Sequence, residues 1–390
     1  MPSWRNWSGK LASKPQRLLH LYSETQAAAL AQSAALQGQR IRAVGAGHSH
    51  QSLVQNQDLI VDLLGLSGVI SSDPQAHSAW VWGGSRIYTL GTALAASGLA
   101  LSNQGDIDQQ TICGATATGT HGTGAQLGSL SSRVIGARIA LANGELVDCG
   151  PGQEADLWQA CRLHLGALGL ITRVRLALEP SYCLLEQRLE IPLEQALADI
   201  QSMMANNRHC EFFWYPQTDQ AHIKLTNKTD RPPVYPLAEE GERCGWSHEV
   251  LPNHRPIRHT EMEYSVPADQ GPACMQAIQG LLTKQFREVR WPVEYRALGQ
   301  EDVWLSTACD RPTVTISVHQ GVEEDEGPYF RACEEIFLAF QGRPHWGKVN
   351  YLGGKEFAAL YPKWSDWWAV RDRVDPKGAF LNPYLESIRP

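Results

Sequence analysis

Several features are missing from this sequence, and each absence narrows the range of functions. No apolar run approaches the length of a transmembrane helix, and the N-terminus from Met1 to Trp7 has no apolar signal segment. Basic residues are not in excess, because 34 lysines and arginines stand against 41 acidic residues. This balance argues against nucleic acid or an anionic membrane as a partner. The nine cysteines have no paired spacing, which predicts reduced thiols in a cytoplasmic protein.

Two glycine-rich stretches lack the residues that well-known phosphate-binding motifs require. The first, Gly45 to His50, has histidine where the dinucleotide fingerprint needs its last glycine. The second, Gly114 to Gly124, has Thr120 where a P-loop needs lysine. No CxxC or HExxH pattern accompanies His48 and His50, so a zinc enzyme is a remote alternative.

Both stretches nevertheless consist largely of small residues near short apolar runs. They therefore bring bare backbone N–H groups into tight turns, which can hold a pyrophosphate. Each also carries a histidine, His48 or His121, that a purely structural turn does not need. The alternative is that both stretches are structural hairpin turns whose histidines occur by chance. Because two such stretches occur in one chain, this alternative is less favoured than it would be for a single stretch.

The length of 390 residues is long for one core and predicts two domains. Up to Leu178, short strands such as residues 40–44 alternate with helices such as residues 87–96. Glu179 and Pro180 then mark a boundary. We therefore expect a first domain over residues 1–179.

Beyond this boundary the pattern repeats. Residues 182–225 and 261–319 each predict a strand, a helix and two further strands, joined by a Pro-rich and charged loop at 228–256. Such repetition predicts an α+β fold with an antiparallel sheet flanked by helices, here a second domain over residues 180–342. We expect the aromatic and basic segment 343–390 to return to the first domain.

Two predicted strands of the second domain carry polar residues on one face. Glu294 and Arg296 alternate with apolar neighbours and lie about 7 Å apart along their strand. In the strand 313–319, the apolar side chains face the core, and the opposite face carries Thr313, Thr315, Ser317 and His319. This face is either solvated or the floor of a polar site, and spacing alone does not decide between the two.

Over nearly its whole length the chain resembles the aldonolactone oxidoreductases of the vanillyl-alcohol-oxidase, PCMH-type flavoprotein family, L-gulono-1,4-lactone oxidases above all. The order and spacing of the segments carry the resemblance more than any one of them. They are Val44–Ser49, Gly105–Ile107, Thr120–Gly124, Gly166–Thr172, Trp214–Pro216, Tyr264–Pro267, Pro292–Arg296, Arg343–Lys348 and Asp375–Leu385. The chain is shorter than the eukaryotic lactone oxidases, and alditol oxidases share its first loop and its His345–Lys348 segment.

The resemblance implies a two-domain flavoprotein with a PCMH-type FAD domain and a substrate domain. It implies that FAD binds to Gly45, Ala46, Gly47, His48, Ser49, Gly105, Asp106, Gly114, Ala115, Thr118, Gly119, Thr120, His121, Gly122, Gly169, Ile171 and Lys348. The histidine that matches His48 bonds covalently to the flavin 8α-methyl in the family. A loop histidine bonded only to backbone is the alternative, and we interpret His50 as loop structure.

The resemblance also assigns catalytic roles. Arg296 and Lys348 would supply cations for the reduced flavin, with Lys348 on the N1 side. Glu294 would accept a hydrogen bond from a sugar hydroxyl and orient Arg296. His319 is a candidate base or substrate ligand, against the alternative of a polar-face histidine without a proton role. His345 is interpreted as structural.

The implied function is oxidation of a carbinol of a sugar-derived 1,4-lactone of the gulono, galactono or arabinono type. Hydride would pass to flavin N5, and dioxygen or another acceptor would reoxidise the flavin. Two alternatives stay open: an alditol oxidase, and a flavin-binding electron-transfer protein without turnover. We expect no metal, no nucleic acid and no membrane partner.

Overall fold

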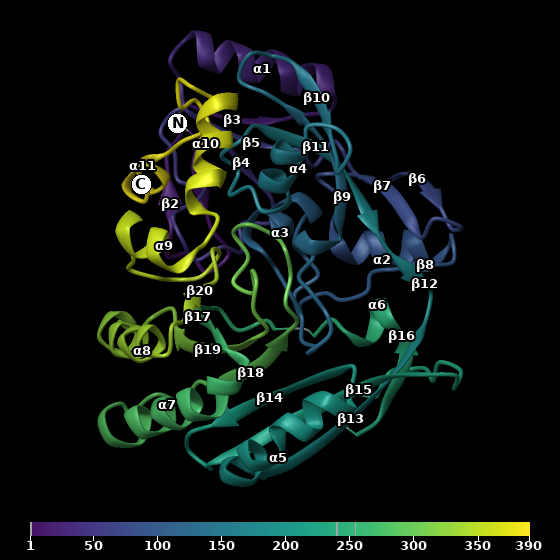
Figure 1. Cartoon of the computed structure of the whole chain (residues 1–390), viewed down its shortest axis with the longest axis vertical. Coiled ribbons are helices and arrows are strands. Elements are labelled where there is room, and N and C mark those ends of the chain that lie inside the picture. The colour runs from purple at the N-terminus through teal and green to yellow at the C-terminus, as the bar shows by residue number, and fades with distance from the viewer. Residues whose placement is uncertain (1, 239–240, 254) are drawn as a thin grey trace.

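The computed structural model describes residues 2–238, 241–253 and 255–390. Figure 1 shows two parts. The N-terminal half forms one part, and the C-terminal helices α9, α10 and α11 lie beside it. The middle of the chain forms the other part around a single large sheet.

The N-terminal part contains two main sheets. One is a parallel three-stranded sheet in the order β3–β5–β4, and the other has antiparallel pairs in the order β10–β9–β11–β7–β6. The bounds are β3 Arg17–His20, β4 Ile41–Val44, β5 Leu59–Asp62, β6 Val69–Asp73, β7 Ser78–Trp82, β9 Val134–Ala140, β10 Leu146–Cys149 and β11 Leu170–Ala177. Shorter elements complete this part: β1 Trp4–Arg5, β2 Ala12–Ser13, α2 Ile87–Ala95, β8 Leu99–Ala100, α4 Ala155–Arg162 and β12 Glu179–Pro180.

Local chemistry explains two elements of this part. Helix α1 (Glu24–Leu36) begins at Ser23, whose side chain accepts a hydrogen bond from the backbone of Gln26, and it buries a row of alanines. Strand β11 buries its alternate apolar residues and leaves Arg173 and Arg175 partly exposed, as the alternation predicts.

The second glycine-rich stretch is not one loop. Helix α3 (Ile112–Thr118) occupies its first half, with the Thr111 hydroxyl accepting a hydrogen bond from Gly114 N at 3.2 Å. The helix ends at Gly119, whose φ of +76° favours glycine. The expectation of tight turns was wrong for this half, because a threonine N-cap followed by alanine and threonine can form a short buried helix.

The second part is an eight-stranded sheet with antiparallel pairs in the order β16–β13–β15–β14–β18–β19–β17–β20. Helices α5, α7 and α8 lie on the face away from the N-terminal part (Figure 1), so the expected α+β fold is confirmed. The bounds are β13 Cys183–Pro192, α5 Leu193–Asn206, β14 His209–Tyr215, β15 Gln220–Thr229, β17 His259–Pro267, α7 Gly271–Gln285, β18 Val293–Leu298, β19 Thr313–Gly321, α8 Gly327–Ala339 and β20 Arg343–Pro344.

The predicted loop 228–256 contains regular structure. Strand β16 (Arg243–Trp246) pairs with β13, and helix α6 (Ser247–Val250) follows it. The prediction failed because backbone pairing at a sheet edge stabilises a short strand that its Pro-rich, charged surroundings hide. Residues 239, 240 and 254 of this loop lie outside the described residues.

The C-terminal segment contains α9 (Gly354–Leu360), α10 (Trp364–Val374) and α11 (Pro383–Ser387). Its tryptophans share a hydrophobic core with β9 and β11. The indole of Trp367 donates to the carbonyl of Leu163 at 3.0 Å. The end of the chain therefore contacts the N-terminal part directly.

Candidate active site

Two cavities meet at the first glycine-rich loop. One, of about 680 Å³, lies where the two parts of the molecule face each other. The other, of about 90 Å³, runs through the N-terminal part beside α3. His48 and Ser49 line both of them. We call them the large cavity and the narrow cavity.

Backbone and small side chains form much of the narrow cavity. A Cβ added at Gly45 would lie 2.3 Å from the hydroxyl of Thr111, and one at Gly84 would lie 1.9 Å from the carbonyl oxygen of Leu63. Its walls therefore have no room for side chains at these two glycines. The predicted residues on this cavity are Gly45, Ala46, Gly47, His48, Ser49, Gly114, Thr118, Gly169 and Ile171.

The other predicted cofactor residues lie elsewhere. Ala115 packs in the hydrophobic core, Gly119 ends α3, and Gly122 lies against Gln104 in a neighbouring small pocket. The large cavity is lined by the remaining ones, which are Gly105, Asp106, Thr120, His121 and Lys348.

His48 is held by the N-terminal segment as well as by its own loop. Trp7 donates its backbone N–H to Gly47 at 2.7 Å, and its indole stacks on the His48 ring at 5.5 Å. The buried Nδ1 of His48 makes no hydrogen bond with the described residues. Burial lowers the pKa of His48 to about 4, with the charges of Lys348 and Arg86 adding to the effect. The imidazole is therefore neutral at pH 7.

At one end of the large cavity, Arg296 joins three carboxylates. Its guanidinium lies 2.5 Å from Glu294, 2.9 Å from Glu211 and 3.2 Å from Asp106. Glu294 and Arg296 therefore share one face of β18, as predicted. Sheet pairing supplies Glu211, which lies opposite Arg296 on β14.

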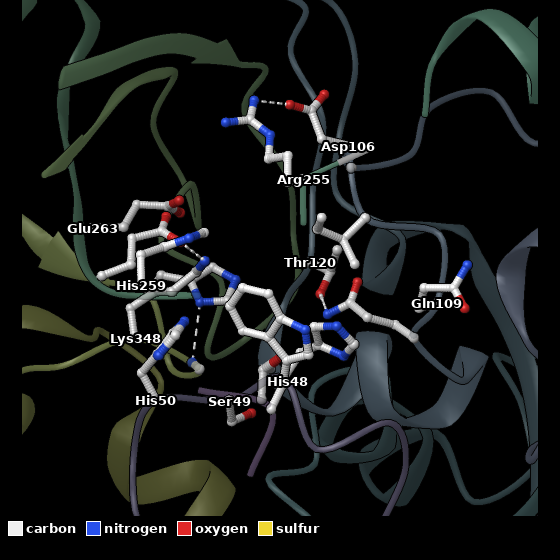
Figure 2. A pocket seen from close by; sticks show the side chains of 18 of the residues that line it. His48, Ser49, His50, Asp106, Gln109, Thr120, Arg255, His259, Glu263 and Lys348 are labelled. Carbon is white, nitrogen blue, oxygen red and sulfur yellow. Dashed lines mark hydrogen bonds and ion pairs between the residues drawn. The ribbon is translucent and has the colours of Figure 1, made fainter. Parts of the chain in front are cut away.

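Asp106 connects the two parts of the molecule through its charge. Its carboxylate contacts Arg255, which Figure 2 shows beside it, and it lies 3.9 Å from the ammonium of Lys224. Although burial alone would raise it, the pKa of Asp106 is held well below its usual range by Lys224, Arg255 and Arg296.

Glu294 titrates in the opposite direction. Burial raises the pKa of Glu294 to about 8, against the attraction of Arg296 and Arg255 and with the help of nearby Asp106 and Glu211. This carboxyl can therefore carry a proton near neutral pH, unlike its neighbour Asp106.

A second cluster of acidic, basic and histidine side chains lines the same cavity around Lys348, which Figure 2 labels. Lys348 donates a hydrogen bond to Glu261, and His319 Nε2 lies 3.8 Å from the same carboxylate. Burial lowers the pKa of His319 to about 4. Its Nδ1 bonds to the carbonyl of Pro292 at 2.9 Å, so Nε2 of the neutral ring is free to accept a proton or a hydrogen bond.

His121, from the loop that follows α3, contacts β17 two residues beyond Glu261. It bonds to Glu263 at 3.0 Å, and Glu263 also accepts a hydrogen bond from Ser317 at 2.8 Å. Despite burial, Glu263 raises the pKa of His121. The His345 ring accepts a hydrogen bond from the backbone of Gly347 at 3.0 Å, which fits the structural role predicted for it.

The polar face of the predicted strand 313–319 is buried rather than solvated. Thr315 and Ser317 bond to Ser265 and Glu263 of β17. Sequence reasoning missed Glu261 and Glu263, although these residues alternate along β17 in the manner used for β18. It also missed His259, which precedes Glu261 in the same alternation, and Glu211 and Arg255, for which no local signal exists.

The family models match most of the chain. The model described as D-arabinono-1,4-lactone oxidase matches residues 174–243 and 234–388, and the model described as FAD binding domain matches residues 15–150. The chain belongs to the D-arabinono-1,4-lactone oxidase family. The resemblance to aldonolactone oxidoreductases is thereby confirmed.

Several curated proteins are similar to this chain over nearly their whole length. L-gulono-1,4-lactone dehydrogenase of Mycobacterium tuberculosis is 34% identical, with 99% of each chain covered. L-gulonolactone oxidase of Bos taurus is 25% identical over 99% of this chain and 98% of its own. Alditol oxidase of a Streptomyces species is 27% identical over 98% of both.

Among solved structures, cholesterol oxidase of Brevibacterium sterolicum has a TM-score of 0.86 at 18% identity. It covers 100% of this chain and 96% of its own, so the two-part fold is shared. No helix within residues 2–238, 241–253 and 255–390 is long and apolar enough to cross a membrane.

Proposed function

We propose that this chain is an FAD-dependent oxidoreductase that oxidises a carbinol of a sugar-derived 1,4-lactone of the gulono, galactono or arabinono type. One observation carries the proposal. A narrow cavity with glycine walls opens at His48 onto a large cavity that contains Arg296, Glu294, His319 and Lys348. Bound FAD would supply the hydride acceptor where the two meet.

The residues of the narrow cavity suit FAD. The close approach of Gly45 to Thr111 and of Gly84 to Leu63 leaves a slot whose walls offer backbone groups, as phosphates require. The unpaired Nδ1 of His48 supports a covalent bond to the flavin. The low pKa of His48 keeps its ring neutral, and only the neutral form is nucleophilic.

The covalent bond can be tested by acid precipitation. Wild-type precipitate should stay yellow, and His48→Ala should release its flavin into the supernatant. The matched control is His50→Ala, which changes the same loop and should keep the yellow precipitate. A colourless wild-type precipitate would contradict the covalent bond and leave FAD binding itself standing.

The large cavity suits a neutral polyhydroxylated molecule. Arg296 and Lys348 donate hydrogen bonds, Glu261 and His319 accept them, and Glu294 can do either as it gains or loses its proton. We assign Arg296 and Lys348 to stabilising negative charge that develops during hydride transfer. We assign Glu294 to a substrate hydroxyl, and His319 Nε2 to accepting the carbinol proton.

Anaerobic mixing of the holoenzyme with lactones and alditols tests the function. Lactones should bleach the flavin faster than alditols, and a second mixing with dioxygen or an artificial acceptor should restore its colour. Faster bleaching by alditols would favour the alditol-oxidase alternative. Flavin that neither class reduces would indicate a flavin-binding protein without turnover.

The nine free cysteines support a reducing, cytoplasmic location.

A further inference from the structure

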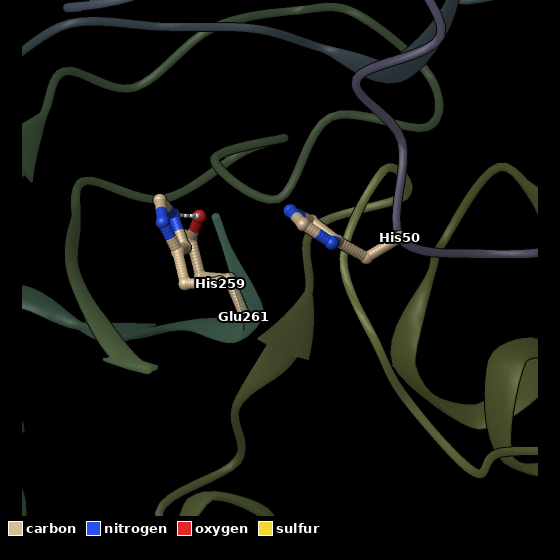
Figure 3. Close-up of side chains that lie close together, drawn as sticks. All are labelled: His50, His259 and Glu261. Carbon is tan, nitrogen blue, oxygen red and sulfur yellow. Dashed lines mark ion pairs between the residues drawn. The ribbon is translucent and has the colours of Figure 1, made fainter. Parts of the chain in front are cut away.

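Three side chains converge in the large cavity, and the proposed reaction uses only one of them, Glu261, as a hydrogen-bond acceptor. His50 comes from the first loop, whereas His259 and Glu261 lie on β17 (Figure 3). One ligand atom of each lies within 4.8 Å of the other two, and all three residues are buried.

His259 presents an acceptor atom to this point. The Nδ1 atom of His259 lies 3.0 Å from the carbonyl oxygen of Ile257. Because a carbonyl only accepts, the neutral ring carries its proton on Nδ1 and keeps a lone pair on Nε2. That Nε2 lies 3.9 Å from Glu261. Such a carbonyl–histidine pair fixes the ring orientation in many metal sites.

One ring nitrogen of His50 has no hydrogen-bond partner among the described residues. Its backbone N–H donates to Gly347 at 2.7 Å, which fixes its position, yet its buried Nδ1 has no hydrogen bond to any described residue. Buried polar atoms without a partner are uncommon. Two imidazoles and a carboxylate therefore lie together in a buried place, and no described residue bonds to Nδ1 of His50. A cation bound among the three would stabilise this arrangement.

Lys348 competes for this position. It already donates a hydrogen bond to the Glu261 carboxylate, so a metal ion must share or replace that contact. Two positive charges on one carboxylate repel each other. The affinity for a metal ion should therefore be limited by Lys348, and removing its charge should strengthen binding.

We propose that His50, His259 and Glu261 form a binding site for Zn²⁺ or a similar borderline transition-metal ion. Two imidazoles and one carboxylate are a common protein ligand set for Zn²⁺, with further positions open to solvent or another ligand. The ion would lie in the cavity to which we assign the substrate. Binding should therefore exclude the lactone, and this consequence alone rests on the proposed function.

Equilibrium dialysis of the holoenzyme with Zn²⁺, followed by elemental analysis, tests the site without substrate. Co²⁺ offers a second probe, because its tetrahedral complexes absorb beyond the flavin bands. We expect one ion per chain, and a loss of affinity of at least about tenfold in both His259→Gln and Glu261→Gln. His345→Gln is the matched control, since His345 belongs to the neighbouring His121, Glu263 and His345 group.

Lys348→Met gives a result that mere disruption of the cavity would not. Zn²⁺ should bind this variant more tightly than wild type, because the competing charge is gone. Absence of Zn²⁺ binding at millimolar concentration, unchanged affinity in both ligand variants, or loss only in His345→Gln would each overturn the proposal. Bound flavin reports folding in every variant. If lactones fail to reduce the flavin, the proposed function fails, whereas the dialysis result still decides the metal site.

Discussion

The narrow and large cavities meet at His48 but differ in how they are built. In the narrow cavity, Gly45 and Gly84 approach other backbone or side-chain atoms so closely that a methyl group would collide. In the large cavity, charged and histidine side chains from both parts of the molecule provide the walls. A site made by the absence of side chains is visible in a short stretch of sequence. A site made by side chains from many segments exists only after folding.

The largest expected effect is at the charged end of the large cavity. Arg296→Ala removes charge-assisted hydrogen bonds and leaves Glu294 and Glu211 without their shared partner. We expect flavin reduction by lactone to slow by a factor corresponding to about 2–5 kcal/mol, with flavin still bound. Stopped-flow absorbance measures the rate. Arg296→Lys keeps the charge and should fall in between, whereas near-normal reduction in Arg296→Ala would separate this cluster from the reaction.

A change in the narrow cavity should instead affect cofactor binding. The methyl group of Gly45→Ala would displace the Thr111 hydroxyl that caps α3, and overpacking of this kind costs about 1–3 kcal/mol. The flavin content per purified chain should fall, as absorbance would show. Gly152→Ala is the matched control, because nothing lies within 4 Å of its added Cβ. Full flavin content in Gly45→Ala would mean that this wall does not contact FAD.

The features that the sequence predicted correctly are local ones, and those that it missed depend on distant segments. The alternation in β18 and β19 predicted the faces of these strands. It placed Glu294 on the same face as Arg296, because side chains two residues apart on a strand point the same way. Cross-strand pairing then brought Glu211 to Arg296, a contact 85 residues apart in the chain. No local pattern reveals such a contact.

The same limit applies to the surroundings of His48. Trp7 stacks on it from an N-terminal segment that has no motif of its own. In α3, a threonine cap and tertiary packing outweighed the glycines that suggested tight turns. Sequence reasoning therefore found the glycines and histidines of the first loop, and it missed the residues that hold them in place.

Lys348 should affect the chemistry at the junction of the two cavities less strongly. Lys348→Met removes a cation that is 22% exposed and already paired with Glu261, so solvent and Glu261 reduce its influence to about 1–2 kcal/mol. The midpoint potential of the flavin should fall by about 20–40 mV for two electrons. Sulfite should also bind more weakly.

Redox titration measures the change, and Lys363→Met is the surface control, because the Lys363 side chain is 45% exposed. If the potential and the sulfite affinity both stay at the wild-type values, Lys348 does not act on the flavin. Arg296 would then be the remaining candidate cation from the sequence prediction.

The last expected effect is on stability rather than on catalysis, and it concerns the proton on Glu294. The folded protein keeps this proton up to pH of about 8, because burial raises the pKa of Glu294, whereas in the unfolded chain the pKa returns to the ordinary value of 4.5. Unfolding therefore releases a proton between these pH values, and a rise in pH through this window favours unfolding.

Relative to Glu294→Gln, the free energy of unfolding of the wild type should fall by about 1.4 kcal/mol per pH unit, and then level off above the folded pKa. Denaturant titrations from pH 5 to pH 9 measure the difference. Asp106→Asn should give no such trend between pH 5 and pH 9, because the pKa of Asp106 is lowered on folding from its ordinary value of 3.8 and its stabilising effect is lost only in more acidic solution. A parallel pH dependence for wild type and Glu294→Gln would mean that Glu294 is ionised in the folded protein, and that the Arg296 charge outweighs the cost of burial.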